Sequence, residues 1–168
     1  MQNENQPDLI PAPSGNEKKL KSYRLPIYTV TLVRDGCVKS VREACDTASK
    51  AAALFWPLIG GKDREHFAVL MVDARSKPIG LSVVSIGTVS ASLVHPRELF
   101  KPAILAGAAA IVVAHNHPSG EVTPSPEDKD ATRRIVRAGE LLGVPCLDHV
   151  ILGVEQGEKF SFKEAGII

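Results

Sequence analysis

The chain has 168 residues, of which 44% are hydrophobic and 23% charged, and its formal net charge is +1. These values are typical of a globular protein with a buried core, and they give no support for the large basic surface of many nucleic-acid-binding proteins. The three scattered cysteines contain no C-x-x-C pair, which favours reduced thiols over a zinc ribbon or a thioredoxin-like site. Because no apolar run could span a bilayer and the N-terminus has no secretory pattern, we expect a cytoplasmic protein without a membrane partner.

The first part of the chain differs in composition from the rest. Residues 1–24 are rich in Asn, Gln, Pro, Ser and Lys and cannot bury enough apolar surface to fold alone, so we predict a flexible polar tail. Residues 25–43 are predicted to be a strand-rich lead-in. Within them LPIYTVTLV, residues 25–33, has the β-branched and aromatic content of a strand, and Asp35-Gly36 is a turn signal.

The rest of the chain alternates between helix and strand patterns, which predicts an α/β or α+β sandwich around one sheet. The spacing of apolar residues predicts helices over 41–59, 95–110 and 126–143. Apolar runs predict strands over 65–73, 78–94, 111–117 and 146–154, the second of them continuous or bent near Gly87. Pro102 lies inside the second helix, where a proline removes a backbone hydrogen bond, so we predict a kink or a shortened helix.

Two of the five histidines, His115 and His117, stand one residue apart at the end of an apolar strand. Residues i and i+2 of a strand point to the same face, so the two imidazoles are expected to emerge together. A pair of surface histidines beside a loop would give the same pattern, and the pair alone does not establish a metal site.

Asp128 is the expected third ligand. The segment SPED, residues 125–128, is typical of a helix start, with Ser125 as the N-cap and Asp128 closing a capping box, and this structural role alone would explain both residues. Asp128 also lies on a helical stripe whose other members are apolar, so its carboxylate is predicted to face inward, where it needs an ionic partner or a metal. Those other members are Ala131, Ile135, Ala138 and Leu142.

Two imidazoles and one carboxylate form the three-ligand set that catalytic zinc sites commonly use, with water in the fourth position. Bound zinc lowers the pKa of that water from about 16 to about 7. We therefore predict one Zn²⁺ per chain, held by His115, His117 and Asp128. A hydrolytic site also needs a general base. Of the candidates Glu43, Glu65, Glu98, Glu121 and Glu127, Glu65 is favoured because its strand can lie beside the histidine strand, and Glu98 and Glu121 stay open as alternatives.

The spacing of His115, His117, Ser125 and Asp128 resembles the JAMM signature of the JAB/MPN metalloprotease superfamily. The flanking segments HNHPSG, HPRELF and LLGVPCLDHVILG are similar to the RadC branch of that superfamily, and the resemblance covers about residues 44–168. It predicts a lone JAB domain, without the N-terminal helix-hairpin-helix module that RadC-like proteins often carry.

The resemblance implies a cytidine-deaminase-like fold, in which a three-layer α/β arrangement places helices on both sides of a mixed sheet. It implies that the zinc ligands are His115, His117 and Asp128, that Ser125 hydrogen-bonds the tetrahedral intermediate, and that Glu65 is the general base. The implied function is a zinc-dependent metallopeptidase or isopeptidase acting on an unidentified peptide or protein.

Two other functions remain open at this stage. One is a DNA-repair-associated RadC-type protein that acts on or near nucleic acid without peptidase activity, which the net charge does not support. The other is a non-catalytic binding domain. The presence of all the motif residues argues against it. Asp148 is a further candidate for orienting a ligand histidine through its free ring nitrogen, whereas its neighbour His149 is assigned no role. The sequence does not indicate an oligomeric state.

Overall fold

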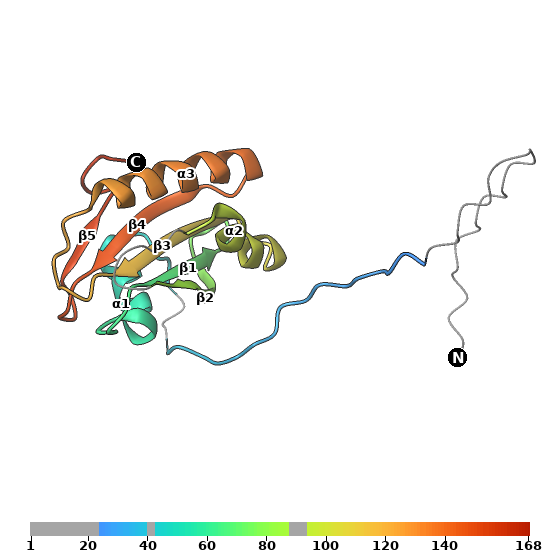
Figure 1. Ribbon diagram of the computed structural model, residues 1–168, viewed down its shortest axis with the longest axis horizontal. Helices are drawn as coiled ribbons and strands as arrows, with labels where there is room; N and C mark the ends of the chain where they lie inside the picture. Colours follow the sequence, from blue (N-terminus) through green and yellow to red (C-terminus); the bar gives the residue numbers. More distant parts are fainter. Residues whose placement is uncertain (1–23, 40–42, 88–93) are drawn as a thin grey trace, which may run out of the picture.

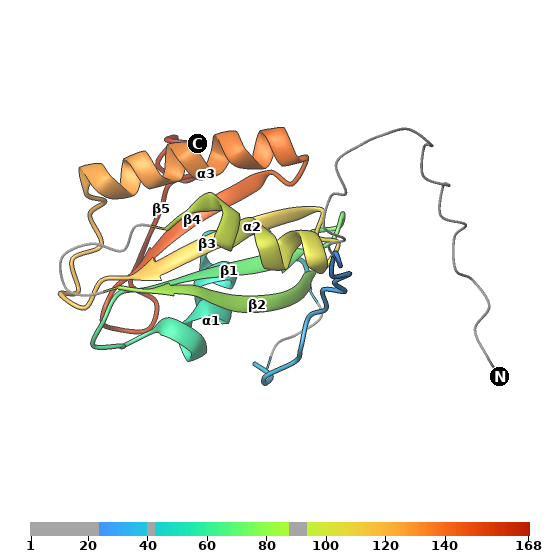
Figure 2. The same ribbon diagram turned by 45° about the vertical axis from the view of Figure 1, so that its right-hand side comes forward.

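The computed structural model describes residues 24–39, 43–87 and 94–168. Within these residues a mixed sheet of five strands has the order β2-β1-β3-β4-β5. Helix α1 covers one face of the sheet, and α2 and α3 cover the other (Figures 1 and 2). The predicted three-layer α/β architecture is therefore confirmed. The elements are α1 Ala48–Ile59, β1 His66–Val72, β2 Pro78–Ile86, α2 Pro96–Leu105, β3 Ala110–Asn116, α3 Pro126–Leu142, β4 Cys146–Leu152 and β5 Lys159–Ser161.

Strand β3 is central to the sheet, and all seven of its residues are buried. It pairs antiparallel with β1 on one side and parallel with β4 on the other, and α3 is the crossover that makes the parallel pair possible. Strand β3 ends at Asn116 and α3 begins at Pro126, so both approach the same edge of the sheet. Crevices at the carboxyl ends of parallel strands are the usual place for ligands in α/β proteins.

Each face of the sheet has its own apolar core. On the α1 face, Phe55 and Ile59 pack with alternate residues of β1, β3 and β4. On the α2 and α3 face, Leu99, Phe100 and Ile135 pack with the other set of residues from β1 and β3. The two-residue alternation of the strands therefore assigns each buried side chain to one helix layer.

The lead-in strand predicted over residues 25–33 is wrong. Residues 24–39 form neither helix nor strand, and their side chains are exposed apart from Val38, including Ile27 at 98% and Val33 at 86%. The segment leads away from the sheet in Figure 1. Its composition suits a strand, but a strand needs a hydrogen-bonded partner, and the described residues provide none for it. The predicted tail over residues 1–24 lies, apart from residue 24, outside the described residues.

Several element boundaries also differ from the prediction. Helix α1 begins at Ala48 rather than residue 41, because the side chain of Thr47 caps it by accepting a hydrogen bond from the Lys50 N–H. Helix α2 ends at Leu105, three residues after Pro102, as expected for a shortened helix. Strand β2 ends at Ile86, and residues 88–93 of the predicted long strand lie outside the described part. Strand β5 was not predicted, because three residues give too little pattern to recognise.

Gly139 allows α3 to approach the sheet closely. A methyl group there would lie 2.7 Å from the Val144 carbonyl oxygen and 3.3 Å from the Phe100 ring. Gly139→Ala is therefore expected to lower the free energy of unfolding by roughly 1–3 kcal/mol, the usual cost of overpacking, less the ~1 kcal/mol by which alanine exceeds glycine in helix propensity. Urea unfolding measures the change. Gly36→Ala, where no atom lies within 4 Å of the added carbon, is the control. A Gly139→Ala protein more stable than the wild type would contradict the close approach, because the gain in helix propensity would then meet no overpacking cost.

Candidate metal centre

The three predicted metal ligands lie together. One ligand atom from each of His115, His117 and Asp128 lies within 4.8 Å of the others. The two Nε2 atoms are 2.9 Å apart, and His115 Nε2 lies 3.2 Å from Asp128 Oδ1. His117 Nε2 lies 3.6 Å from Asp128 Oδ2. The end of β3 supplies the imidazoles and the first turn of α3 supplies the carboxylate, as the sequence predicted.

These separations fit a zinc ion. Ligand atoms about 2.0–2.2 Å from zinc in a tetrahedral arrangement lie roughly 3.3–3.6 Å from one another, and the observed separations run from 2.9 to 3.6 Å. The donor set of two imidazoles and one carboxylate is also one that catalytic zinc sites use. His115 is fully buried, whereas 17% of the His117 side chain is exposed, so the cluster has one side that solvent reaches.

The charges within the cluster favour an ionised carboxylate. Burial raises the pKa of Asp128, but the close contacts of its carboxylate with the imidazoles of His115 and His117 outweigh burial and hold that pKa well below its usual value. The hydrogen bond to Asp128 in turn raises the pKa of His117, against the opposing effect of its burial. A carboxylate that stays ionised can act as a metal ligand, and His117 must release its proton before it can do so.

Both imidazoles are oriented by a hydrogen bond at the nitrogen that faces away from the cluster. His117 Nδ1 contacts the backbone carbonyl oxygen of Glu121 in the loop between β3 and α3. His115 Nδ1 lies 2.8 Å from Nε2 of His149, a fully buried residue of β4. Each ring therefore presents Nε2 to the cluster, which is the arrangement expected of ligand histidines.

Asp148 does not orient a ligand histidine, contrary to the prediction. Its carboxylate accepts hydrogen bonds from Ser161 Oγ at 2.7 Å and from the backbone N–H groups of Lys163 and His149 at 3.0 and 2.8 Å. Successive residues of a strand face opposite sides of the sheet, so Asp148 faces away from the cluster and its neighbour His149 faces toward it. No pattern in the sequence distinguishes these two neighbours, because the face of β4 that lies over the site depends on how the strands pack.

Ser125 combines a cap and a contact with the candidate ligand. It is the N-cap of α3, and its Oγ accepts a hydrogen bond from the Asp128 N–H at 3.1 Å. Asp128 Oδ2 accepts from the Ser125 N–H at 2.8 Å and from its hydroxyl at 2.6 Å. The predicted capping box is therefore formed, and it fixes the carboxylate beside the two imidazoles.

Ser125→Ala is expected to lower the free energy of unfolding of the metal-free protein by about 1 kcal/mol, because it removes the cap acceptor. Ser125→Gly should lower it by only a few tenths of a kcal/mol, since glycine is tolerated at this position. Ser125→Thr keeps the hydroxyl and is the matched control. Urea unfolding compares the four proteins, and an alanine variant as stable as the wild type would show that the cap contributes nothing.

Glu65 lies across from the histidine pair. Strands β1 and β3 pair with Phe67 opposite His115, and two further steps of the same register place Glu65 opposite His117. Glu65 is half-buried, and its charge contributes to raising the pKa of His117. The two other open candidates are engaged elsewhere: Glu98 is exposed beside Arg97, and the Glu121 carboxylate accepts hydrogen bonds from Thr123.

Asn116, for which the sequence predicts no role, fixes the backbone on both sides of Glu65. Its side chain is buried and donates to the carbonyl oxygens of Lys62 and Arg64, at 3.2 and 3.0 Å. It also accepts from the His66 N–H at 2.8 Å. Asn116 stands between the two histidines and faces the opposite side of β3, so one strand end supplies two candidate ligands and the clamp for the candidate base.

Comparison with known proteins identifies the family. A family model described as the RadC-like JAB domain matches residues 45–167. The chain belongs to the RadC-like JAB domain family. It is 52% identical to a UPF0758 protein of Rubrobacter xylanophilus over 110 residues, 66% of this chain and 47% of that protein. It is 50% identical to a UPF0758 protein of Caldanaerobacter subterraneus over 103 residues, 61% of this chain and 43% of that protein.

The match therefore spans a little under half the length of these curated relatives. Among the described residues of this RadC-like JAB domain, no helix is both long and apolar enough to cross a membrane.

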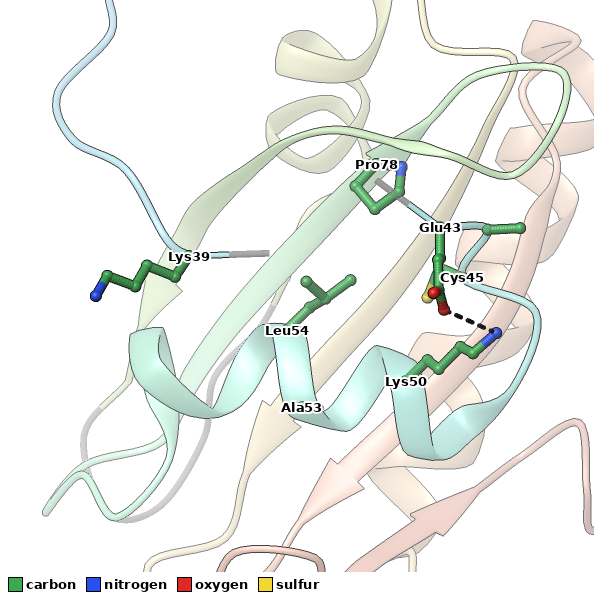
Figure 3. Close-up of a pocket in the computed structure, with 8 residues that line it drawn as sticks. Lys39, Glu43, Cys45, Lys50, Ala53, Leu54 and Pro78 are labelled. Atoms are coloured by element: carbon green, nitrogen blue, oxygen red, sulfur yellow. Dashed lines mark ion pairs between the residues drawn. The ribbon is translucent and has the colours of Figure 1, made fainter. Parts of the chain in front are cut away.

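Two hollows of about 200 Å³ lie among the described residues, and they share no lining residue. The first includes His117 and Asn116 among its lining residues, so it adjoins the cluster of candidate ligands. Its other lining residues are Gly61, Lys62, Asp63, Pro118, Gly153 and Val154. The second lies against α1, where Lys50 pairs with Glu43 over Cys45 (Figure 3). None of the candidate site residues lines the α1 hollow, so the hollow beside His117 is the one relevant to the JAB site.

Proposed function

We propose that this RadC-like JAB domain is a zinc-dependent hydrolase that cleaves amide or isopeptide bonds in a peptide or protein. The observation that carries the proposal is the convergence of His115, His117 and Asp128 within 4.8 Å, from two separate elements of the fold. Zinc held by these residues would supply a Lewis acid and a water molecule that ionises near neutral pH. Family membership and the fit of the donor set to zinc support the proposal.

The chain's own residues have distinct tasks in this proposal. Glu65, opposite His117, takes a proton from the attacking water and passes it to the leaving nitrogen. Ser125 Oγ lies 2.6 Å from Asp128 Oδ2. Its hydroxyl turns to donate a hydrogen bond to the carbonyl oxygen of the amide group being cleaved. The hollow beside His117 holds the part of the substrate that lies on one side of the scissile bond.

The test joins metal analysis to a cleavage screen. We expect the purified full chain to contain close to one zinc per molecule by mass spectrometry, and to cleave members of a peptide and isopeptide library in a chelator-sensitive way. Cleavage should return when zinc is added back. A metal-free protein whose thermal unfolding ignores both chelator and added zinc would contradict the proposal. Salt-dependent DNA binding in place of cleavage would favour the nucleic-acid alternative.

A further inference from the structure

His149 is a fully buried histidine whose ring lies among aromatic rings. It stacks on Phe162 with the ring centroids 4.7 Å apart, and it is tilted against Phe67 at 5.2 Å. A polar ring in such surroundings is costly unless both of its nitrogens have partners. Nε2 lies 2.8 Å from Nδ1 of His115, and Nδ1 lies 2.6 Å from the hydroxyl of Thr132 in α3.

The direction of each hydrogen bond follows from counting hydrogens. Thr132 Oγ1 also lies 2.6 Å from the backbone carbonyl oxygen of Asp128, which can only accept, so the single hydroxyl hydrogen of Thr132 goes there. Thr132 Oγ1 must then accept from Nδ1–H of His149. A neutral imidazole has one N–H, so Nε2 of His149 accepts from Nδ1–H of His115. The lone pair of His115 is left on Nε2.

We propose that His149, held by Thr132, is a positioning residue that fixes His115 in the tautomer whose Nε2 is ready to bind the metal ion. The inference rests on the zinc site proposed above and deepens it. Ligand histidines usually donate their second N–H to a carboxylate, a backbone carbonyl or a water molecule. Here the acceptor is another histidine, whose own orientation is set by a threonine.

The contacts form a closed circuit that joins two candidate ligands from different elements. It runs from His115 in β3 to His149 in β4, then to Thr132 in α3 and to the Asp128 backbone one turn earlier in the same helix. The Asp128 carboxylate closes it at 3.2 Å from His115. The ring of His117 stands outside the circuit because its Nδ1 contacts the Glu121 carbonyl oxygen. The circuit therefore preorganises His115 and Asp128 relative to each other before a metal arrives.

The test compares zinc affinity in three variants of the full chain, measured by competition with a chromophoric chelator. His149→Phe keeps an aromatic ring between Phe67 and Phe162 but removes the acceptor, and we expect a loss of roughly 10–100-fold in zinc affinity. His149→Gln places an amide oxygen where Nε2 stood, and it should recover part of that loss. Asp148→Asn, on the same strand but the opposite face, should bind zinc as the wild type does.

Thermal unfolding of each metal-free variant separates positioning from stability. We expect metal-free His149→Phe to unfold at a lower temperature than the wild type, because Nδ1–H of the buried His115 loses its acceptor. It should still be folded at the temperature of the zinc titration and bind zinc more weakly. Wild-type affinity in a folded His149→Phe protein would overturn the inference. If His149→Phe does not fold, Thr132→Val takes its place, with a loss of affinity expected and wild-type affinity again overturning the inference.

Long-range ¹⁵N–¹H spectra of the metal-free wild-type protein test the tautomer directly, whether or not zinc binds. We expect His115 and His149 each to carry their proton on Nδ1. A proton on Nε2 of His115 would overturn the inference and leave the proposed function standing. Failure of the wild type to bind zinc, with the expected tautomers observed, would instead count against the proposed function alone.

Discussion

Asp128→Asn is expected to lower the zinc affinity of the protein by more than the roughly 10–100-fold that loss of an outer hydrogen-bond partner costs, and to leave the fold intact. Asparagine has the size of aspartate and can still accept from the Ser125 N–H, which Asp128 Oδ2 does at 2.8 Å. Its amide nitrogen then faces His115, and an amide nitrogen has no free lone pair for a metal. The variant therefore removes one ligand and one negative charge without removing the helix cap.

Zinc content and zinc-dependent stabilisation measure this effect. Zinc at 100 times its dissociation constant stabilises a folded protein by about 2.7 kcal/mol, so added zinc should raise the unfolding temperature of the wild type and not that of Asp128→Asn. Asp130→Asn is the matched control, because Asp130 lies two residues further along α3, is exposed and pairs with Arg133. Equal stabilisation of Asp128→Asn and the wild type would show that Asp128 is not a ligand.

The candidate ligands could be found from sequence because each depends on a local pattern. Two-residue alternation in a strand puts His115 and His117 on one face, and a capping box on an otherwise apolar stripe turns Asp128 inward. Both patterns hold in the structure, although Leu142 at the end of that stripe is 49% exposed. Local geometry decides such features, so the surrounding fold need not be known in advance.

The partners of those ligands could not be found in the same way. His149 reaches His115 only because β4 lies parallel to β3 in a register that places His149 opposite Val113. Asn116 reaches the backbone around Glu65 only because β1 lies on the other side of β3. These are contacts between strands distant in sequence, and no pattern within one strand specifies the register between two.

In the lead-in segment the composition predicted a strand that the structure does not contain. Residues 25–33 have the strongest strand composition before α1, yet they are exposed and form no strand. Strand propensity mainly reflects how well side chains pack on a sheet that is already present. Where the described residues provide no neighbouring strand, the composition alone does not produce one.

The same pairing of strands makes Glu65 the candidate base. The sequence left Glu65, Glu98 and Glu121 open, and the register of β1 against β3 places Glu65 opposite His117. Asn116 holds the carbonyl of the residue before Glu65 and the N–H of the residue after it. The backbone that carries Glu65 is therefore fixed relative to β3. A general base needs such a fixed position, because it must stay within reach of the water molecule from which it takes a proton.

Glu65→Gln is expected to lower kcat on a peptide identified in the library screen by roughly 10²–10⁴-fold, the usual contribution of a general base. Glutamine keeps the size of the side chain but cannot accept a proton at neutral pH. Zinc content should stay at the wild-type level, because none of the three clustered ligand atoms belongs to Glu65. Steady-state kinetics and metal analysis of the same preparation measure both quantities.

Glu98→Gln and Glu121→Gln are the matched controls, because each removes one of the carboxylates that the sequence left as an alternative. Both should retain nearly full turnover, since Glu98 is exposed beside Arg97 and the Glu121 carboxylate contacts Thr123. If Glu121→Gln lost turnover while Glu65→Gln kept it, the proton would travel through the loop between β3 and α3. The base would then be a group that reaches the site only when this loop rearranges. If only Glu65→Gln lost turnover, the general base would be Glu65, the carboxylate that the pairing of β1 with β3 places at the site.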